Sequence, residues 1–149
     1  MVKAVRPPNK ALDPWLERCR AVGMRRTHLL SRVLTTLLKA QNPMDIQTML
    51  QHQQIAGYCD PASLYRLVKK LETIGVVRKI GLHERRAHYI INDESRHQDY
   101  IVCVDCGRVT PLEMDCPVGP VEAEVSQRTG FTRLYHELQF YGTCPRCST

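Results

Sequence analysis

Residues 60–75 read DPASLYRLVKKLETIG. The stretch predicts a helix, because Asp60 can cap the first turn, Pro61 suits the first helical position and Gly75 can end it. The apolar residues recur at helical spacing and form one face: Leu64, Leu67, Val68 and Leu71. The other face is polar and basic. The helix can therefore bury one side in a core and present the other to a polyanion.

Three more helices are predicted upstream of this one. They cover residues 14–22, where Asp13 is the expected N-cap, residues 27–40, and a short segment that Asp45 caps. Downstream, two β-like stretches at 76–80 and 88–91 flank a basic hairpin segment at 81–86. Helices followed by a basic hairpin are the layout of a winged helix-turn-helix, and we expect this domain to span residues 1–91.

In a winged helix-turn-helix, residues 60–75 take the position of the recognition helix. Side chains near its start can approach base edges, whereas the lysines and arginines further on and in the wing suit phosphates. The candidate DNA-binding residues are Ser63, Tyr65, Arg66, Lys69, Lys70, Lys79, Arg85 and Arg86. The competing interpretation is an ordinary core helix with a solvated basic face.

Charge is divided unevenly along the chain. Residues 1–88 hold 16 Lys and Arg against 6 Asp and Glu, whereas residues 89–149 hold 5 against 9. A basic first half suits a nucleic-acid partner, and an acidic second half suits cations. No apolar run reaches the roughly 18 residues of a membrane span, and no apolar segment follows the basic N-terminus. We therefore expect a cytoplasmic protein with no membrane partner.

The second half is predicted to be a small αβ module over residues 92–149. Strands are expected at 100–104, 109–112 and 132–141, and a helix at 118–128. With the winged helix, these elements give an α+β fold. Two Cys-x-x-Cys pairs lie within the module: Cys103, Cys106, Cys144 and Cys147.

Two such pairs supply the four soft ligands of a structural zinc ion. The alternative is redox chemistry at Cys103 and Cys106. A thioredoxin-like pair would open a helix after a strand, whereas both pairs here are expected in turns. A third group, His97, Asp99 and His136, can share an ion or can consist of solvated loop residues.

Several stretches together resemble the Fur family of bacterial metal- or peroxide-responsive repressors. Residues 23–27 read GMRRT, residues 63–66 read SLYR, and residues 97–107 read HQDYIVCVDCG. The likeness extends over about residues 23–147. It implies a homodimer in which the second module dimerises and carries one structural zinc per subunit, while the winged helices bind a palindromic operator.

The resemblance also implies a regulatory metal, but this chain departs from the family at the usual hinge site. Met44, Ile90, Gln98 and Tyr100 stand where that site has its ligands. The family's other site uses a His, an Asp or His, a Glu and a His. His97, Asp99 and His136 match three of these, and Gly119 stands in place of the Glu. Glu122 or Cys116, each about one turn away, could supply the fourth ligand.

The sequence thus predicts a metal-dependent repressor with structural Zn²⁺ and a second divalent metal. Glu122 as fourth ligand would give a nitrogen and oxygen set tolerant of Fe²⁺, Mn²⁺ or Zn²⁺, whereas Cys116 would favour Zn²⁺. One rival is a DNA-binding protein of this fold whose sensor has decayed, which metal-independent operator binding would reveal. The other is a thiol redox enzyme, which would need a reducible disulfide and a thiolate of low pKa.

Overall fold

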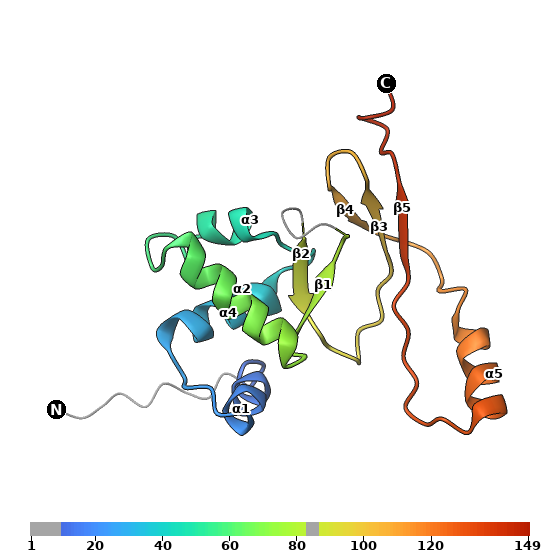
Figure 1. The fold of residues 1–149 in the computed structure, drawn as a ribbon, viewed down its shortest axis with the longest axis horizontal. Coiled ribbons are helices and arrows are strands. Elements are labelled where there is room, and N and C mark those ends of the chain that lie inside the picture. Colours follow the sequence, from blue (N-terminus) through green and yellow to red (C-terminus); the bar gives the residue numbers. More distant parts are fainter. Residues whose placement is uncertain (1–9, 83–86) are drawn as a thin grey trace. The chain divides into compact units, whose positions relative to one another are not determined.

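The computed structural model describes residues 10–82 and 87–149 (Figure 1). Within these residues the chain divides into two compact units. The first holds residues 10–79 and 87–92, and the second holds residues 80–82 and 93–149. Two of the predicted DNA-binding residues, Arg85 and Arg86, lie outside the described residues. Across the part that is described, no helix is both long and apolar enough to cross a bilayer.

Four helices build most of the first unit: α1 (Asp13–Ala21), α2 (His28–Lys39), α3 (Ile46–Gln51) and α4 (Pro61–Thr73). Three begin after a side-chain cap, and two of these caps, Asp45 and Asp60, are the predicted ones. The side chains of Thr27, Asp45 and Asp60 accept hydrogen bonds from the third residue beyond them, at 3.1, 2.7 and 2.8 Å. The prediction for α1 was wrong in one respect. Asp13 is its first residue rather than its cap, and Leu12 precedes it without a side-chain cap.

The core of the first unit lies between the apolar faces of these helices and a β-hairpin. The hairpin strands are β1 (Val77–Ile80) and β2 (His88–Ile91). Met44 pairs with Tyr89 of β2 in an isolated bridge, where the two residues exchange backbone hydrogen bonds at 3.0 and 2.8 Å. The fully buried residues include Leu30, Val33, Leu34, Met49, Leu64, Val68 and Leu71. Helices with a hairpin packed against them form the winged helix that the sequence predicts.

The second unit is a three-stranded sheet with one helix. Its elements are β3 (Tyr100–Cys103), β4 (Val109–Pro111), α5 (Gly119–Thr129) and β5 (Gln139–Gly142). The strand order is β4-β3-β5, with β4 antiparallel to β3 and β5 parallel to it. The α+β fold is therefore confirmed.

The last strand is much shorter than the predicted 132–141. Only residues 139–142 pair, because the partner strand β3 begins at Tyr100 and offers four residues for the ladder. Backbone groups that lack a partner strand cannot be counted as sheet, however well the side chains alternate. Residues 134–138 therefore lead into β5 without being part of it.

The buried face of α4 should be essential to the first unit. We expect Leu64→Ala to lower the free energy of unfolding by about 2–5 kcal/mol, because Leu64 is fully buried and its loss leaves a cavity. Lys70→Ala, on the exposed face of the same helix, should change it by less than about 0.5 kcal/mol. Urea titration followed by the fluorescence of Trp15, the single tryptophan, measures both. Equal effects of the two variants would contradict this packing.

Candidate metal centre

The parallel pairing of β3 with β5 brings both Cys-x-x-Cys pairs to one edge of the sheet. Cys103, the last residue of β3, lies opposite Gly142, the last of β5, and Val104 donates to the Gly142 carbonyl at 3.0 Å. Each strand then runs directly into a turn that holds a cysteine pair. In the first turn, Gly107 donates to the Cys103 carbonyl at 2.9 Å with φ of +75°, a conformation that favours glycine.

The four sulfur atoms of Cys103, Cys106, Cys144 and Cys147 all lie within 4.8 Å of one another. We call this group the four-cysteine cluster. The sulfurs of Cys106 and Cys144 are 3.8 Å apart, which is the edge of a tetrahedron with metal–sulfur bonds of about 2.3 Å, as for zinc. All four cysteines are free thiols. The donor set and its spacing therefore fit a closed, tetrahedral zinc site.

Backbone hydrogen bonds already favour a thiolate in this cluster. The amides of Cys106 and Cys144 lower the pKa of Cys103 to about 6, and the Cys144 amide donates to its sulfur at 3.3 Å. Cys147 has the opposite shift. Hydrogen bonds with Cys144 and Cys106 raise its pKa to about 12. Four thiolates cannot coexist there without a cation, so metal binding must displace protons.

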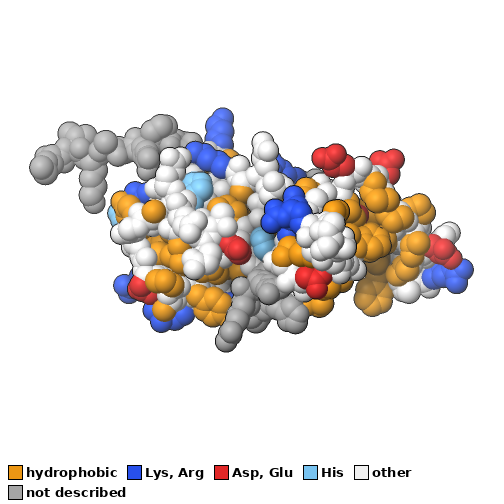
Figure 2. Space-filling view, turned by 90° about the horizontal axis from the view of Figure 1, so that it is seen from above, with side chains coloured by type: hydrophobic (Ala, Val, Ile, Leu, Met, Phe, Trp, Pro, Cys, Tyr) orange, Lys and Arg blue, Asp and Glu red, His pale blue; other side chains and the backbone are white. Residues whose placement is uncertain are grey.

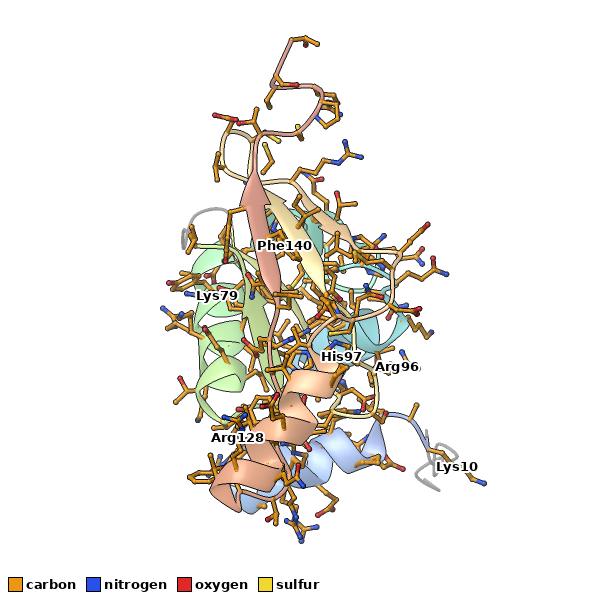
Figure 3. All side chains as sticks on the ribbon, turned by 90° about the vertical axis from the view of Figure 1, so that its right-hand side faces the viewer. Lys10, Lys79, Arg96, His97, Arg128 and Phe140 are labelled. Carbon is orange, nitrogen blue, oxygen red and sulfur yellow. The ribbon has the colours of Figure 1, made fainter. Side chains whose placement is uncertain are left out.

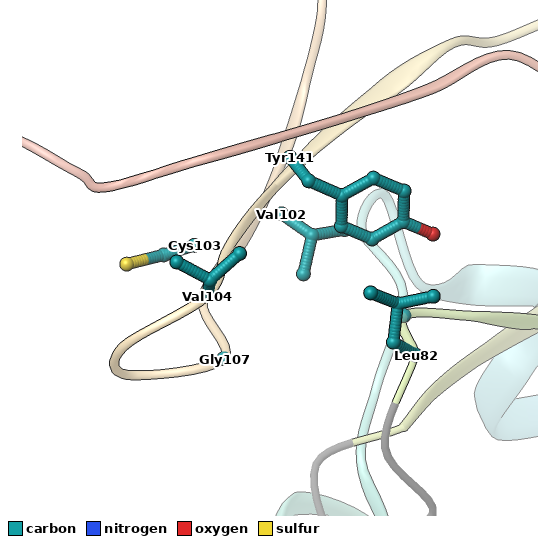
Figure 4. A pocket seen from close by; sticks show the side chains of 7 residues that line it. Leu82, Val102, Cys103, Val104, Gly107 and Tyr141 are labelled. Carbon is teal, nitrogen blue, oxygen red and sulfur yellow. The ribbon is translucent and has the colours of Figure 1, made fainter.

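A small apolar hollow lies next to this cluster within the second unit (Figure 4). Its walls are formed by Gly81, Leu82, Val102, Cys103, Val104, Gly107 and Tyr141. Beside it, Gly81 donates its amide to the Gln139 side chain at 3.1 Å. Cys103 is buried and contributes both to the wall of this hollow and to the four-cysteine cluster.

The opposite ends of the same two strands hold a second cluster. His97 and Asp99 come just before β3, and His136 comes three residues before β5, so the parallel register brings them together. Cys116, in the loop between β4 and α5, completes the group. One donor atom from each of the four residues lies within 4.8 Å of the others, and Figure 3 shows His97 near the start of α5.

Among the members of this second cluster, Asp99 most clearly indicates a cation site. Its side chain is only 6% exposed, and within the described part of the chain its Oδ1 atom accepts no hydrogen bond. The Nε2 atom of His97 lies 3.1 Å from Oδ1, which is an ion pair when the imidazole is protonated. A buried carboxylate oxygen without a donor is costly unless a cation compensates it. The set of two imidazoles, one carboxylate and one thiol fits a divalent metal ion.

The two candidates for the fourth ligand occupy opposite sides of the His136 ring. The sulfur of Cys116 is 3.1 Å from Nε2, whereas Oε2 of Glu122 is 2.5 Å from Nδ1. Cys116 therefore belongs to the cluster, and Glu122 contacts it only through His136. Partial burial and the neighbouring Asp99 carboxylate raise the pKa of the Cys116 thiol, although the Val118 amide opposes that shift.

Sequence reasoning missed a role for Gln98, which it noted only as a residue that does not bind metal. The side-chain amide of Gln98 donates to the carbonyls of Asp99 and Leu112, both at 2.9 Å, and Leu112 donates its own amide back to the Asp99 carbonyl at 2.9 Å. These bonds tie the segment before β3 to the exit of β4. Because these hydrogen bonds depend on tertiary contacts, no local sequence pattern predicts them.

The predicted DNA-binding residues of the first unit lie mostly on the outer face of α4. Tyr65, Arg66 and Lys70 are exposed, while Lys69 is half-buried and paired with Glu72 at 2.7 Å. The hydroxyl of Ser63 donates to the capping Asp60 at 2.8 Å and accepts from Arg66 at 3.4 Å. Lys79 lies on β1 (Figure 3).

A winged helix joined to a unit with two metal-capable clusters defines a recognisable class of proteins, and sequence comparison gives the family. The sequence profile described as the ferric uptake regulator family matches residues 21–141. The chain therefore belongs to the ferric uptake regulator family, a family of metal-responsive regulators.

Individual relatives agree with this assignment. The ferric uptake regulation protein of Synechococcus elongatus is 29% identical over 86 residues, which are 58% of each chain. That of Cupriavidus metallidurans is 29% identical over 85 residues, 57% of this chain and 58% of its own. The chain thus spans less than two thirds of the length of the curated relatives it matches.

Solved structures share the fold over almost the whole chain. The Helicobacter pylori ferric uptake regulator, described as having three functional metal-binding sites, superposes with a TM-score of 0.69 at 19% identity, covering 93% of this chain and 94% of that one. The Pseudomonas aeruginosa regulator with manganese gives 0.67 at 24% identity, covering 87% and 97%. At these identities, the likeness concerns the fold.

Zinc should be indispensable to the second unit. We expect Cys144→Ser to lose one zinc ion per chain and to unfold this unit, because structural zinc supplies much of the folding free energy of a small module. Elemental analysis and circular dichroism measure the two effects. Cys59→Ser, which changes a half-buried thiol of the first unit, should keep the zinc. A folded Cys144→Ser protein with unchanged melting would refute a structural role for the four-cysteine cluster.

Proposed function

We propose that the protein is a metal-dependent transcriptional repressor that binds a palindromic DNA operator as a homodimer. The observation that carries the proposal is the combination, in one chain of this family, of a winged helix with an exposed basic α4 and a second unit with two metal-capable clusters. The first cluster is a structural zinc site. The second holds the exchangeable metal that controls DNA binding.

The chemistry of α4 supports its role as the recognition helix. Leu64, Val68 and Leu71 bury one face of α4 in the first unit. On the other face, Tyr65, Arg66 and Lys70 are exposed. An arginine can donate two hydrogen bonds to the major-groove edge of guanine, and lysines suit phosphates. The Ser63–Arg66 contact is long, at 3.4 Å, so Arg66 can leave it at little cost.

Dimer formation is supported by the apolar surface of the second unit. No residue of α5 is buried, and Val121 and Val125, one turn apart, are 53% and 39% exposed. On the sheet, Ile101 and its register partner Phe140 are 38% and 44% exposed. Figure 2 shows hydrophobic side chains gathered on this unit, at the right of the view, and Figure 3 labels Phe140 on β5. A second copy of the unit would remove this surface from water.

The proposed DNA contacts give separable effects. Arg66→Ala should weaken binding to an operator, selected from random duplex DNA, by roughly 1–3 kcal/mol, because a base-edge contact is lost. Lys79→Ala should weaken specific and random DNA alike and reduce the salt dependence by about one counterion. Arg128→Ala, on α5 of the second unit, is the control. Fluorescence anisotropy at several salt concentrations measures the DNA affinity of all three variants. Normal operator binding by Arg66→Ala would exclude α4 as the recognition helix.

The regulatory role of the second cluster is tested by a double variant. We expect His97→Ala/His136→Ala to retain the zinc of the four-cysteine cluster but to lose a second metal and metal-stimulated operator binding. A hundredfold stimulation corresponds to about 2.7 kcal/mol of coupling free energy. Elemental analysis and anisotropy are the measurements. If the variant still binds a second metal and its operator binding still responds to that metal, the sensor site lies elsewhere. Metal-independent operator binding by the wild-type protein would instead favour the alternative of a DNA-binding protein whose sensor site has decayed.

A further inference from the structure

We propose that Cys116, and not Glu122, is the fourth ligand of the second cluster, that Glu122 positions His136, and that this ligand set selects zinc over manganese and iron. The inference rests on the proposed function, because it assigns roles within the regulatory site. It goes beyond that function by naming the metal and by giving Glu122 a role outside the coordination shell.

The buried Asp99 carboxylate indicates where the cation binds. Its Oδ1 atom lacks a hydrogen-bond donor although the residue is 94% buried. The donor atoms within reach of it are the ring nitrogens of His97 and His136 and the sulfur of Cys116. The two imidazole rings lie 4.6 Å apart between centroids and are tilted by 58°. The Nε2 atom of His97 lies 3.1 Å from this oxygen but without hydrogen-bond geometry. A metal ion held between the carboxylate, the ring nitrogens and the sulfur would compensate the buried charge.

The two nitrogens of His136 separate the roles of Cys116 and Glu122. Nε2 faces the Cys116 sulfur at 3.1 Å, and Nδ1 faces the Glu122 carboxylate at 2.5 Å. A ring whose Nε2 binds a metal keeps its proton on Nδ1 and donates it, which is what Glu122 accepts here. Histidine ligands are commonly held this way by a carboxylate, which fixes the tautomer and raises the basicity of the binding nitrogen. Glu122 is therefore a positioning residue.

The sulfur of Cys116 determines the choice of metal. The Val118 amide, at the start of α5, donates to this sulfur at 3.5 Å and so helps to hold it beside the two imidazoles. Two imidazoles, one carboxylate and one thiolate make a compact four-donor set. Zinc accepts such a tetrahedral set with sulfur, whereas manganese prefers oxygen ligands in six-fold coordination. A sulfur donor therefore shifts the selectivity of the cluster toward zinc.

Cobalt(II) is a spectroscopic probe of this ligand set. The full chain, with zinc retained in the four-cysteine cluster, is titrated with Co²⁺. We expect a sulfur-to-cobalt charge-transfer absorption as one cobalt binds, and its loss in Cys116→Ser at unchanged zinc content. In Cys116→Asp, the preference for Zn²⁺ over Mn²⁺, measured by competition, should fall by about tenfold or more.

Glu122→Gln distinguishes a positioning residue from a ligand. We expect this variant to keep the charge-transfer absorption of the wild type but to bind Co²⁺ and Zn²⁺ about 10–100-fold more weakly. Glu124→Gln is the matched control, because Glu124 lies on the same helix and pairs with Arg128 instead. It should bind metal as the wild type does.

The outcomes separate this inference from the proposed function. A second metal that binds the wild type without sulfur absorption, and equally well in Cys116→Ser, overturns the ligand assignment but leaves a regulatory site. Loss of the absorption in Glu122→Gln at unchanged zinc content overturns the positioning role. A wild-type chain that takes up no second metal overturns the regulatory site itself.

Discussion

The parallel pairing of β3 with β5 is the constraint on which the second unit depends. Four residues of each strand lie side by side in register, from Tyr100 opposite Gln139 to Cys103 opposite Gly142. Because the strands are parallel, their ends coincide at both edges of the ladder. The carboxyl ends lead into the four-cysteine cluster, and the segments before the amino ends bring His97, Asp99 and His136 together. At about 3.3 Å per residue, the two clusters are separated by roughly 13 Å of strand.

The two clusters differ in the chemistry of their donor atoms. Four thiolates in a closed tetrahedron hold zinc tightly and leave no position for exchange, which suits a structural ion. The second cluster mixes nitrogen, oxygen and sulfur, and three of its residues come from loops next to strands. Its shape is maintained by the surrounding contacts, such as the hydrogen bonds of Gln98 and the carboxylate of Glu122. This arrangement is consistent with the exchangeable metal that we propose for the second cluster.

The first unit has its own core and its own caps. Its helices begin where Thr27, Asp45 and Asp60 accept backbone hydrogen bonds, and the hydrogen bonds that Ser63 gives to Asp60 lower the pKa of that carboxyl. Asp60 therefore stays ionised at neutral pH and caps α4 beside the exposed basic side chains. A rigid helix start would favour the DNA contacts that we propose for α4, because little order would be lost when the side chains bind.

The sequence by itself determined the helices, the winged hairpin, the four-cysteine motif and the resemblance to this family. These features are local: caps, apolar spacing and short cysteine turns are written within a few residues. The extent of the last strand and the fourth member of the second cluster depended on the tertiary structure. The length of β5 is limited by the four residues that β3 offers. In the sequence, Cys116 and Glu122 both lie within about one helical turn of Gly119, the position of the family's Glu ligand. Only the tertiary structure shows that the Cys116 sulfur faces Nε2 of His136, whereas the Glu122 carboxylate contacts Nδ1 on the other side of the ring.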